Sequence, residues 1–531
     1  MNPGTLTTNA PVRARNALCA MLAWALAAAP FGAPRAQPAP APGVFGAALP
    51  APAAPPTADT PVPRAGTSLP ELGDSATVAL SPAQERRIGE TALKQIRAGG
   101  GYLDDPEVND YLNQLGGRLV AVRNDPRYEF TFFAVPDPSI NAFALPGGYI
   151  GVNTGLILLA QTESELASVL AHEITHVTQN HMARMIESQK NSLWMSLAAL
   201  AVAIVASRSN SSSGNDAAGA ALTSAQALAM QNALNFTREN EYEADRIGFQ
   251  RLELAGFDVN APATLMDRLQ KATRFVDGNA PSYLRTHPIS YERIAEAQAR
   301  AANVPYRQVA DSLDFQMVRA LLRSYAGTPA EAVAWFDTAI AQRKYNNEVA
   351  ARYGLVASLL RDGRIPRAKE ELAALEKIAP PHPMIEAIAG HVLLEAGEAG
   401  KAVARFQAAL ARYPNKMQLV YDYPDALLQA GRASDAAAFA EDQLQRFPSD
   451  GRLHRIAARA YAAMDQKQKQ HRHQGEYYAW LGNTRLAIDQ LELAAKAPDA
   501  NFYESSVVET RLRALRKEQA DQQKEGFGRA G

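Results

Sequence analysis

The spacing of apolar residues along the chain predicts a mostly helical protein with one short β-rich stretch. The helical pattern begins at Ser81, a natural N-cap, and Pro82 suits the first helical position. It continues through Leu103–Arg123, where apolar residues recur at roughly helical spacing. Three segments then predict a small sheet: Tyr128–Val135, Ala142–Leu145 and Tyr149–Val152.

The next helical segment, Leu166–His181, carries two histidines on one face. Thr162 before it has the position of an N-cap, and Glu165 has that of the partner residue in a capping box. His172 and His176 are four residues apart, so their side chains lie on the same side of a helix. The apolar residues recur at helical spacing: Leu166, Val169, Leu170, Ile174 and Val177.

Two imidazoles one helical turn apart can bind one Zn²⁺ ion at about 2.0–2.1 Å without distorting the backbone. Glu173, beside His172, is then placed to take a proton from a water molecule on the metal. This arrangement hydrolyses amide bonds. The alternative is a chance match, because only three positions of the pattern are fixed.

The predicted sheet would lie beside this helix. Its edge strand could pair with an extended substrate peptide, which gives affinity without sequence specificity. Alternatively, the sheet only supports the helix, and the sequence does not decide between the two.

A third metal ligand is predicted in the helical run from about Ala220 to Gly256. Glu241 and Asp245 share a face, so one carboxylate can bind the metal while the other accepts the spare N–H of a histidine ligand. Glu243 falls on another face, where solvation or pairing with Arg238 or Arg246 of the same helix is expected. The alternative is an ordinary charged helix surface.

The carboxy-terminal part contains a repeat with a period of 34 residues. Small residues fall where paired helices approach each other, and a proline falls where the second helix ends. Such units stack into a curved array with a concave surface that binds protein, either substrate or a partner complex. The repeated positions are Gly363, Gly397 and Gly431, then Ala368, Ala402 and Ala436, then Pro380, Pro414 and Pro448.

The amino terminus predicts secretion. Arginines precede the apolar run Ala17–Ala29, and small residues lead to a cleavage site near Ala36, as in a signal peptide. The single cysteine, Cys19, lies in that run, so disulfides are not expected in the mature chain. A net charge of −1 gives no electrostatic case for nucleic-acid binding.

A second apolar run, Leu193–Ala206, is too short for a comfortable membrane span and is followed by a segment rich in Ser, Asn and Gly. It is a buried helix, a segment that touches the membrane peripherally, or a lid over the active site. The adjacent Gly and Ser residues favour a mobile cover.

Composition, together with the histidine motif and the repeat, divides the chain into five parts. They are a signal peptide (1–36), a linker rich in Pro and Ala (37–75), a metallopeptidase domain (76–306), a repeat domain (307–505) and a charged tail (506–531).

The motif His172–His176 followed by Glu241–Asp245 resembles the gluzincin metallopeptidases of the CAAX prenyl protease and HtpX type, and Asn141–Ile150 resembles the family's segment before the metal helix. The resemblance implies an α+β peptidase domain with a small sheet, followed by an all-α tetratricopeptide-repeat solenoid, as in the periplasmic branch of the family. It implies one Zn²⁺ per chain with Glu241 as third ligand, which leaves Asp245 as the carboxylate expected to orient a histidine.

Within that branch, a histidine in a Thr-His-Pro segment can approach the zinc ion. Carried over, His287 in Leu284–Pro288 becomes a candidate fourth ligand that displaces the water and keeps the enzyme latent. The alternative is a histidine packed in a loop. His181, five residues beyond His176, is expected to point away from the metal.

The predicted protein is therefore a periplasmic zinc metalloendopeptidase with chaperone-like activity. By resemblance, its substrates are misfolded or stalled outer-membrane β-barrel proteins, and the repeat domain contacts the β-barrel assembly machinery. The rival hypothesis is a repeat-based chaperone or adaptor whose zinc site is structural or latent.

Overall fold

The computed structural model describes residues 81–123, 125–185, 237–273, 283–284 and 287–528. The predicted signal peptide, the linker and the apolar run Leu193–Ala206 lie outside the described residues, so these remain predictions. Among the described helices, none combines the length and the apolar character that crossing a bilayer requires.

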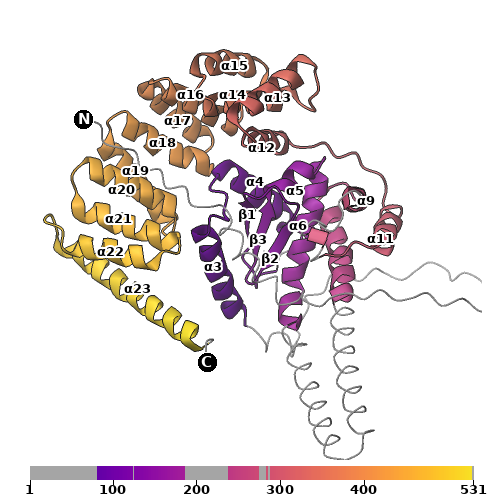
Figure 1. The fold of residues 1–531 in the computed structure, drawn as a ribbon, viewed down its shortest axis with the longest axis horizontal. Coiled ribbons are helices and arrows are strands. Elements are labelled where there is room, and N and C mark those ends of the chain that lie inside the picture. The colour runs from indigo at the N-terminus through magenta and orange to yellow at the C-terminus, as the bar shows by residue number, and fades with distance from the viewer. Residues whose placement is uncertain (1–80, 124, 186–236, 274–282, 285–286, 529–531) are drawn as a thin grey trace, which may run out of the picture. The chain divides into compact units, whose positions relative to one another are not determined.

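The amino-terminal described part is built around a three-stranded sheet (Figure 1). The strands are β1 (Thr131–Val135), β2 (Ala142–Leu145) and β3 (Tyr149–Asn153), in the order β1-β3-β2. β1 pairs with β3 in parallel, and β2 pairs with β3 antiparallel. The predicted small sheet is confirmed, and β2 is one of its edge strands.

The two helices that precede the sheet begin as the sequence predicts. α3 (Pro82–Ala98) has a complete capping box at Ser81 and Gln84. α4 (Pro106–Ala121) is capped by Asp105, whose side chain accepts a hydrogen bond from the Val108 N–H. α4 packs on β1.

The tight turn between β2 and β3 depends on glycine. Gly147 and Gly148 have φ angles of +77° and +90°, which side chains with a Cβ disfavour. A Cβ on Gly147 would also lie 2.5 Å from Cα of Arg86 in α3. The turn therefore lets the hairpin lie directly against α3.

The motif helix is α6 (Glu163–Thr178), which follows the short α5 (Thr154–Leu159) and packs on β2. Thr162 caps it by accepting a hydrogen bond from the Glu165 N–H. The expected capping box forms only in part, because the Glu165 carboxylate accepts from the Gln161 N–H and pairs with Arg268. Residues 237–254 are helical, and α9 (Ala261–Thr273) and α11 (Tyr291–Ala301) complete this region.

The carboxy-terminal part is a series of paired helices, as the 34-residue period predicts (Figure 1). Gly363, Gly397 and Gly431 have φ angles of +71°, +75° and +75° in the turns between helices, which explains the periodic glycine. The helices are α12 (Leu313–Ser324), α13 (Pro329–Ala341), α14 (Glu348–Arg361), α15 (Ile365–Ile378), α16 (Pro383–Glu395), α17 (Ala399–Arg412), α18 (Met417–Gln429), α19 (Ala433–Arg446), α20 (Gly451–Ala463), α21 (Lys467–Trp480), α22 (Thr484–Ala495) and α23 (Phe502–Gly528).

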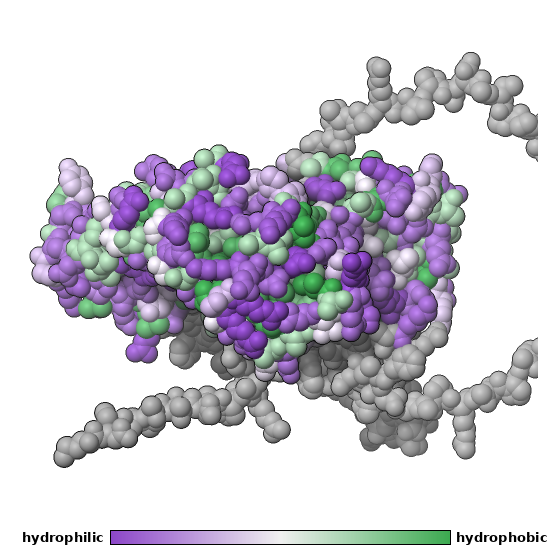
Figure 2. Space-filling model, turned by 90° about the horizontal axis from the view of Figure 1, so that it is seen from above, coloured by the Kyte–Doolittle hydropathy of each residue, from purple (hydrophilic) through white to green (hydrophobic). Residues whose placement is uncertain are grey.

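The last helix includes the segment that the sequence marks as a charged tail. α23 packs on α22, and its Val508, Leu512 and Leu515 side chains are buried in the same apolar cluster as those of α22. The predicted charged tail is therefore not a separate segment, because it belongs to a helix that continues to Gly528. The outer surface mixes hydrophilic and hydrophobic residues on the face shown in Figure 2.

The acidic start of α4 contacts the repeat helices, where Asp105 and Glu107 are half-buried. The Tyr353 hydroxyl lies 2.5 Å from a carboxylate oxygen of Glu107, and the Tyr325 hydroxyl lies 2.6 Å from Asp105. Burial raises the pKa of Glu107 to about 8, and the neighbouring Asp105 carboxylate adds to the shift. Glu107 is therefore protonated near neutral pH in the folded protein.

We expect the variant Glu107→Gln to gain stability over the wild type as pH rises. Neutral Glu107 stabilises the fold fully below its unfolded pKa of 4.5, and this stability is lost as pH rises through about 8. The shift corresponds to as much as about 5 kcal/mol at pH 9, a loss that the neutral glutamine avoids. Thermal unfolding of both proteins at pH 5 and pH 9 measures it, with the exposed Glu395→Gln as control. An equal difference at both pH values would contradict this assignment.

Candidate metal centre

The helix α6 buries both histidines of the motif and the glutamate between them. His172 is 5% exposed and Glu173 is 1% exposed. The Nε2 atoms of His172 and His176 lie 2.9 Å apart, so both ring nitrogens converge on one point, as the four-residue spacing predicts.

The helix at 237–254 brings Glu241 to that point. Its Oε2 atom lies 3.4 Å from His172 Nε2, and its Oε1 atom lies 3.4 Å from His176 Nε2. His287 joins from the segment before α11, with Nδ1 3.2 Å from His172 Nε2 and 2.9 Å from Glu241 Oε1. One donor atom from each of the four side chains lies within 4.8 Å of the others.

These distances fit a divalent metal ion. Donors about 2.0–2.1 Å from a tetrahedral zinc ion stand about 3.3 Å from one another. Five of the separations among the four side chains run from 2.9 to 3.4 Å, and one donor atom from each side chain lies within 4.8 Å of the others. Ring nitrogens and carboxylate oxygens at such separations share a proton or a metal ion, so the donor set suits a metal.

Glu173 lies beside the cluster as the motif predicts. Its Oε1 atom is buried and accepts no hydrogen bond from the described residues, and it stands 3.4 Å from His287 Nε2. A buried carboxylate oxygen of this kind is free to accept a proton from a molecule that enters the site.

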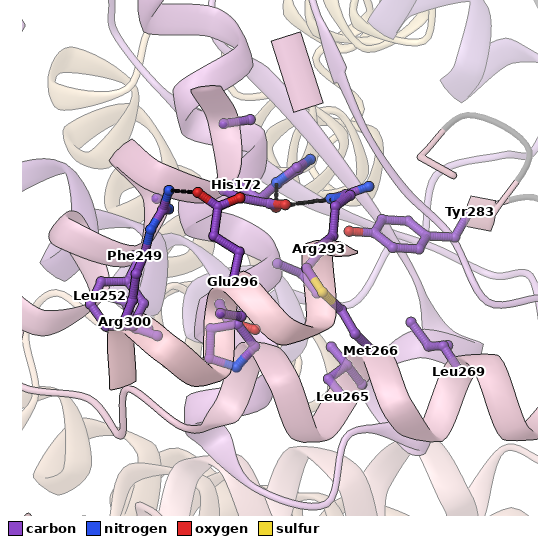
Figure 3. Close-up of a pocket in the computed structure, with 17 residues that line it drawn as sticks. His172, Phe249, Leu252, Leu265, Met266, Leu269, Tyr283, Arg293, Glu296 and Arg300 are labelled. Atoms are coloured by element: carbon purple, nitrogen blue, oxygen red, sulfur yellow. Dashed lines mark hydrogen bonds and ion pairs between the residues drawn. The ribbon is translucent and has the colours of Figure 1, made fainter. Parts of the chain in front are cut away.

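Asp245 lies where the sequence places it, behind a histidine. Its Oδ1 atom is 3.0 Å from His172 Nδ1. Arg293 of α11 in turn holds Asp245, with Nε 2.6 Å from Oδ2 and Nη2 2.8 Å from Oδ1 (Figure 3). Sequence reasoning missed Arg293, which lies 48 residues from its partner.

His181 lies outside the converging donors, as expected, and is buried. Sequence reasoning missed its contact with a ligand, because its Nδ1 atom lies 2.8 Å from His176 Nδ1. α6 ends at Thr178, and Asn180 adopts a φ of +53°, which turns the chain back. The asparagine was the available signal, because Asn commonly ends helices in this conformation.

The expected role of Glu243 is also corrected. Its Oε2 atom lies 3.1 Å from His181 Nε2 and 2.7 Å from Nη2 of Arg184. Glu243 therefore supports the histidine behind His176 rather than pairing with an arginine of its own helix.

The carboxylates determine the charge of the site. Burial lowers the pKa of His172, but Glu241 and Asp245 outweigh it and raise the pKa to about 10. Burial lowers the pKa of His176 to about 4. Burial opposes ionisation of Asp245, yet His172 and Arg293 lower its pKa to about 2. The site thus attracts positive charge, which a metal ion supplies in place of a proton.

A pocket lies beside His172 and Arg293 (Figure 3), and Asp245 also lines it. Apolar side chains from α9 and the helix at 237–254 line it, among them Leu265, Leu269 and Leu252. Glu173, His176 and Glu241 are not among its lining residues. The pocket therefore borders Asp245 and Arg293, which lie behind His172, and does not reach the other converging donor atoms.

Comparison with known proteins gives the family. A family model described as "Peptidase family M48" matches residues 106–301, and a tetratricopeptide-repeat model matches residues 393–460. The beta-barrel assembly-enhancing protease of Escherichia coli strain K12 is 30% identical over 451 residues, which cover 85% of this chain and 91% of that protein.

Two further relatives agree. A Vibrio cholerae protein, provisionally named as a beta-barrel assembly-enhancing protease, is 38% identical over 314 residues, covering 59% of this chain and 64% of that protein, which is less than two thirds of its length. A mitochondrial metalloendopeptidase of Schizosaccharomyces pombe is 30% identical over 217 residues, covering 40% of this chain and 60% of that protein. The chain belongs to peptidase family M48, and it is a metalloendopeptidase that carries tetratricopeptide repeats.

Proposed function

We propose that this protein is a periplasmic zinc endopeptidase that acts in the quality control and assembly of outer-membrane β-barrel proteins. The observation that carries the proposal is the convergence of His172, His176 and Glu241 beside the buried Glu173. Three protein ligands and a neighbouring carboxylate are the parts that a catalytic zinc site needs.

In this proposal, His172, His176 and Glu241 hold the zinc ion, which when bound polarises the scissile carbonyl and makes water a better nucleophile. Glu173 takes the proton of the attacking water at Oε1 and later delivers it to the leaving amine. Asp245 holds the Nδ1 proton of His172, so the Nε2 lone pair faces the metal.

His287 is proposed as a latch. Its Nδ1 atom takes the fourth place around the cluster, and its Nε2 atom faces Glu173, so both parts of the catalytic pair are covered. Tyr283, four residues before it, donates a hydrogen bond from its N–H to the carbonyl oxygen of Ile140, next to the edge strand β2. A closed site with four protein ligands is inactive until the fourth ligand leaves.

The proposed substrates, partners and location rest on the relatives and on the sequence. Two of the relatives are named for β-barrel assembly. The amino-terminal signal pattern supports export to the periplasm, and stacked repeats offer a surface for protein binding, either of a stalled outer-membrane protein or of the assembly machinery.

A second candidate is a repeat-based chaperone or adaptor with a latent zinc site. The closed arrangement of four donors, with His287 in the fourth place, favours it. The two functions differ in whether cleavage is needed.

Metal removal tests the zinc proposal. We expect one Zn²⁺ per purified chain and loss of cleavage of an unfolded casein substrate after chelation, with recovery on adding zinc. The melting temperature should also fall on chelation, because a ligand that binds only the folded state stabilises it in proportion to the logarithm of its concentration over Kd. Unchanged metal-free activity would refute the proposal.

A further inference from the structure

Arg293 connects the two acidic residues of the metal centre. Its side chain is 4% exposed and lies in the first turn of α11. Nε and Nη2 bind the two oxygens of Asp245, while Nη1 lies 2.9 Å from Glu241 Oε2. The same Nη1 donates a hydrogen bond to the carbonyl oxygen of Pro288 at 2.7 Å. This bond holds the guanidinium against the chain just before α11.

The contacts use the planar fork of an arginine. Two parallel hydrogen bonds to Asp245 fix the plane of the guanidinium, and this plane decides where Nη1 points. A lysine ammonium carries the same charge on a single nitrogen, so it cannot bind both oxygens of Asp245 in this geometry and reach Glu241 as well.

We propose that Arg293 is a positioning residue that makes Glu241 a ligand through one oxygen. The inference rests on the proposed metal centre and adds a residue that sets its coordination. Nη1 of Arg293 forms an ion pair with Oε2 of Glu241 at 2.9 Å and so competes for that oxygen, although Oε2 also lies 3.4 Å from His172 Nε2. Oε1 has no contact with the arginine among those described and lies 2.9 Å from His287 Nδ1 and 3.4 Å from His176 Nε2, so it is the oxygen left for the metal.

Binding through one oxygen matters for catalysis. If both oxygens of Glu241 bound the ion, they would fill a position that water or the substrate carbonyl needs, since catalytic zinc sites combine three protein ligands with an open position. Arg293 therefore preserves the open position once the latch has moved.

Charge points to the same role. Glu241 and Asp245 are largely buried, and Arg293 lies within 2.9 Å of both carboxylates. Buried charges are tolerated when they are paired, so the arginine offsets the charge of the two carboxylates together with the metal ion.

The test compares Arg293→Lys and Arg293→Ala with the wild type in the full-length protein. We measure zinc affinity by competition with a chromophoric chelator, and the visible absorption of the Co²⁺-substituted protein. Changes to residues that support metal ligands typically weaken metal binding 10- to 100-fold, and we expect a loss in this range for both variants. The Co²⁺ spectrum should change, because the carboxylate coordination changes.

Arg251→Lys is the matched control. Arg251 is 3% exposed in the helix that carries Glu241, and it binds only backbone carbonyl oxygens, those of Leu119 and Arg123, among the hydrogen bonds described. Its variant should keep wild-type zinc affinity and the wild-type Co²⁺ spectrum. If Arg293→Ala does not fold, Arg293→Lys still decides the question.

Two results separate this inference from the proposed function. A wild type that binds no metal would overturn the proposed function itself. A wild type that binds zinc and cleaves, together with an Arg293→Lys variant of unchanged zinc affinity and Co²⁺ spectrum, would overturn only the role of Arg293.

Discussion

Glu173→Gln should abolish peptide cleavage while the protein keeps its zinc. The amide is nearly isosteric with the carboxylate but cannot take a proton from water. Because Glu173 is not among the four converging donors, the metal site should persist. General base catalysis contributes about 10²–10⁴-fold to a rate, so we expect a loss of about 10³-fold in kcat. The assay is hydrolysis of unfolded casein, with zinc measured in the same sample.

The control for this variant is Glu239→Gln, an exposed glutamate on the helix that carries Glu241. It should cleave at the wild-type rate. More than a tenth of wild-type activity in zinc-loaded Glu173→Gln would remove Glu173 from the mechanism.

The same variant distinguishes the two proposed functions in cells. If cleavage is the function, Glu173→Gln should not correct an envelope defect that the wild type corrects. Equal rescue by both proteins would favour the chaperone or adaptor, since binding through the repeats would then suffice.

The sequence predicted the parts of the metal centre that lie on single helices. His172 and His176 are one turn apart on α6, and Glu241 and Asp245 are one turn apart on another helix, so local geometry fixes each pair. That the two pairs meet was supported only by resemblance, because folding brings them together across about 70 residues of chain.

Residues that act through tertiary contacts could not be predicted from the sequence. Arg293 carries no local signal, since any arginine at the start of a helix looks like a solvated charge. The contact between His181 and His176 depends on the turn at Asn180, which the helical pattern does not reveal. The sheet order β1-β3-β2 likewise depends on a crossover that strand patterns alone do not fix.

The carboxy-terminal part shows a different limit. The 34-residue period predicted the repeats from α14 to α19, where the pattern is repeated with little change. It did not predict that α23 continues to Gly528, because the apolar residues Val508, Leu512 and Leu515 are masked by many charged neighbours. In a segment with many charged residues, a narrow apolar stripe is hard to recognise, although one neighbouring helix is enough to bury it.

His287→Ala should raise proteolysis, by about tenfold or more, if the closed arrangement is the resting state. Removing the imidazole opens the fourth position and uncovers Glu173, so water and substrate can enter. A tenfold rise corresponds to removing about 1.4 kcal/mol of preference for the closed state. The measurement is the initial rate of casein cleavage at saturating zinc.

Zinc affinity provides the decisive second measurement for that variant. If His287 is also a metal ligand, the wild type should bind zinc more tightly than His287→Ala. The variant should therefore cleave faster and bind zinc more weakly. General damage to the site would lower both quantities, as would the loss of a catalytic ligand. Opposite changes in rate and affinity are therefore expected only if His287 closes the site, and a fall in both would refute the latch.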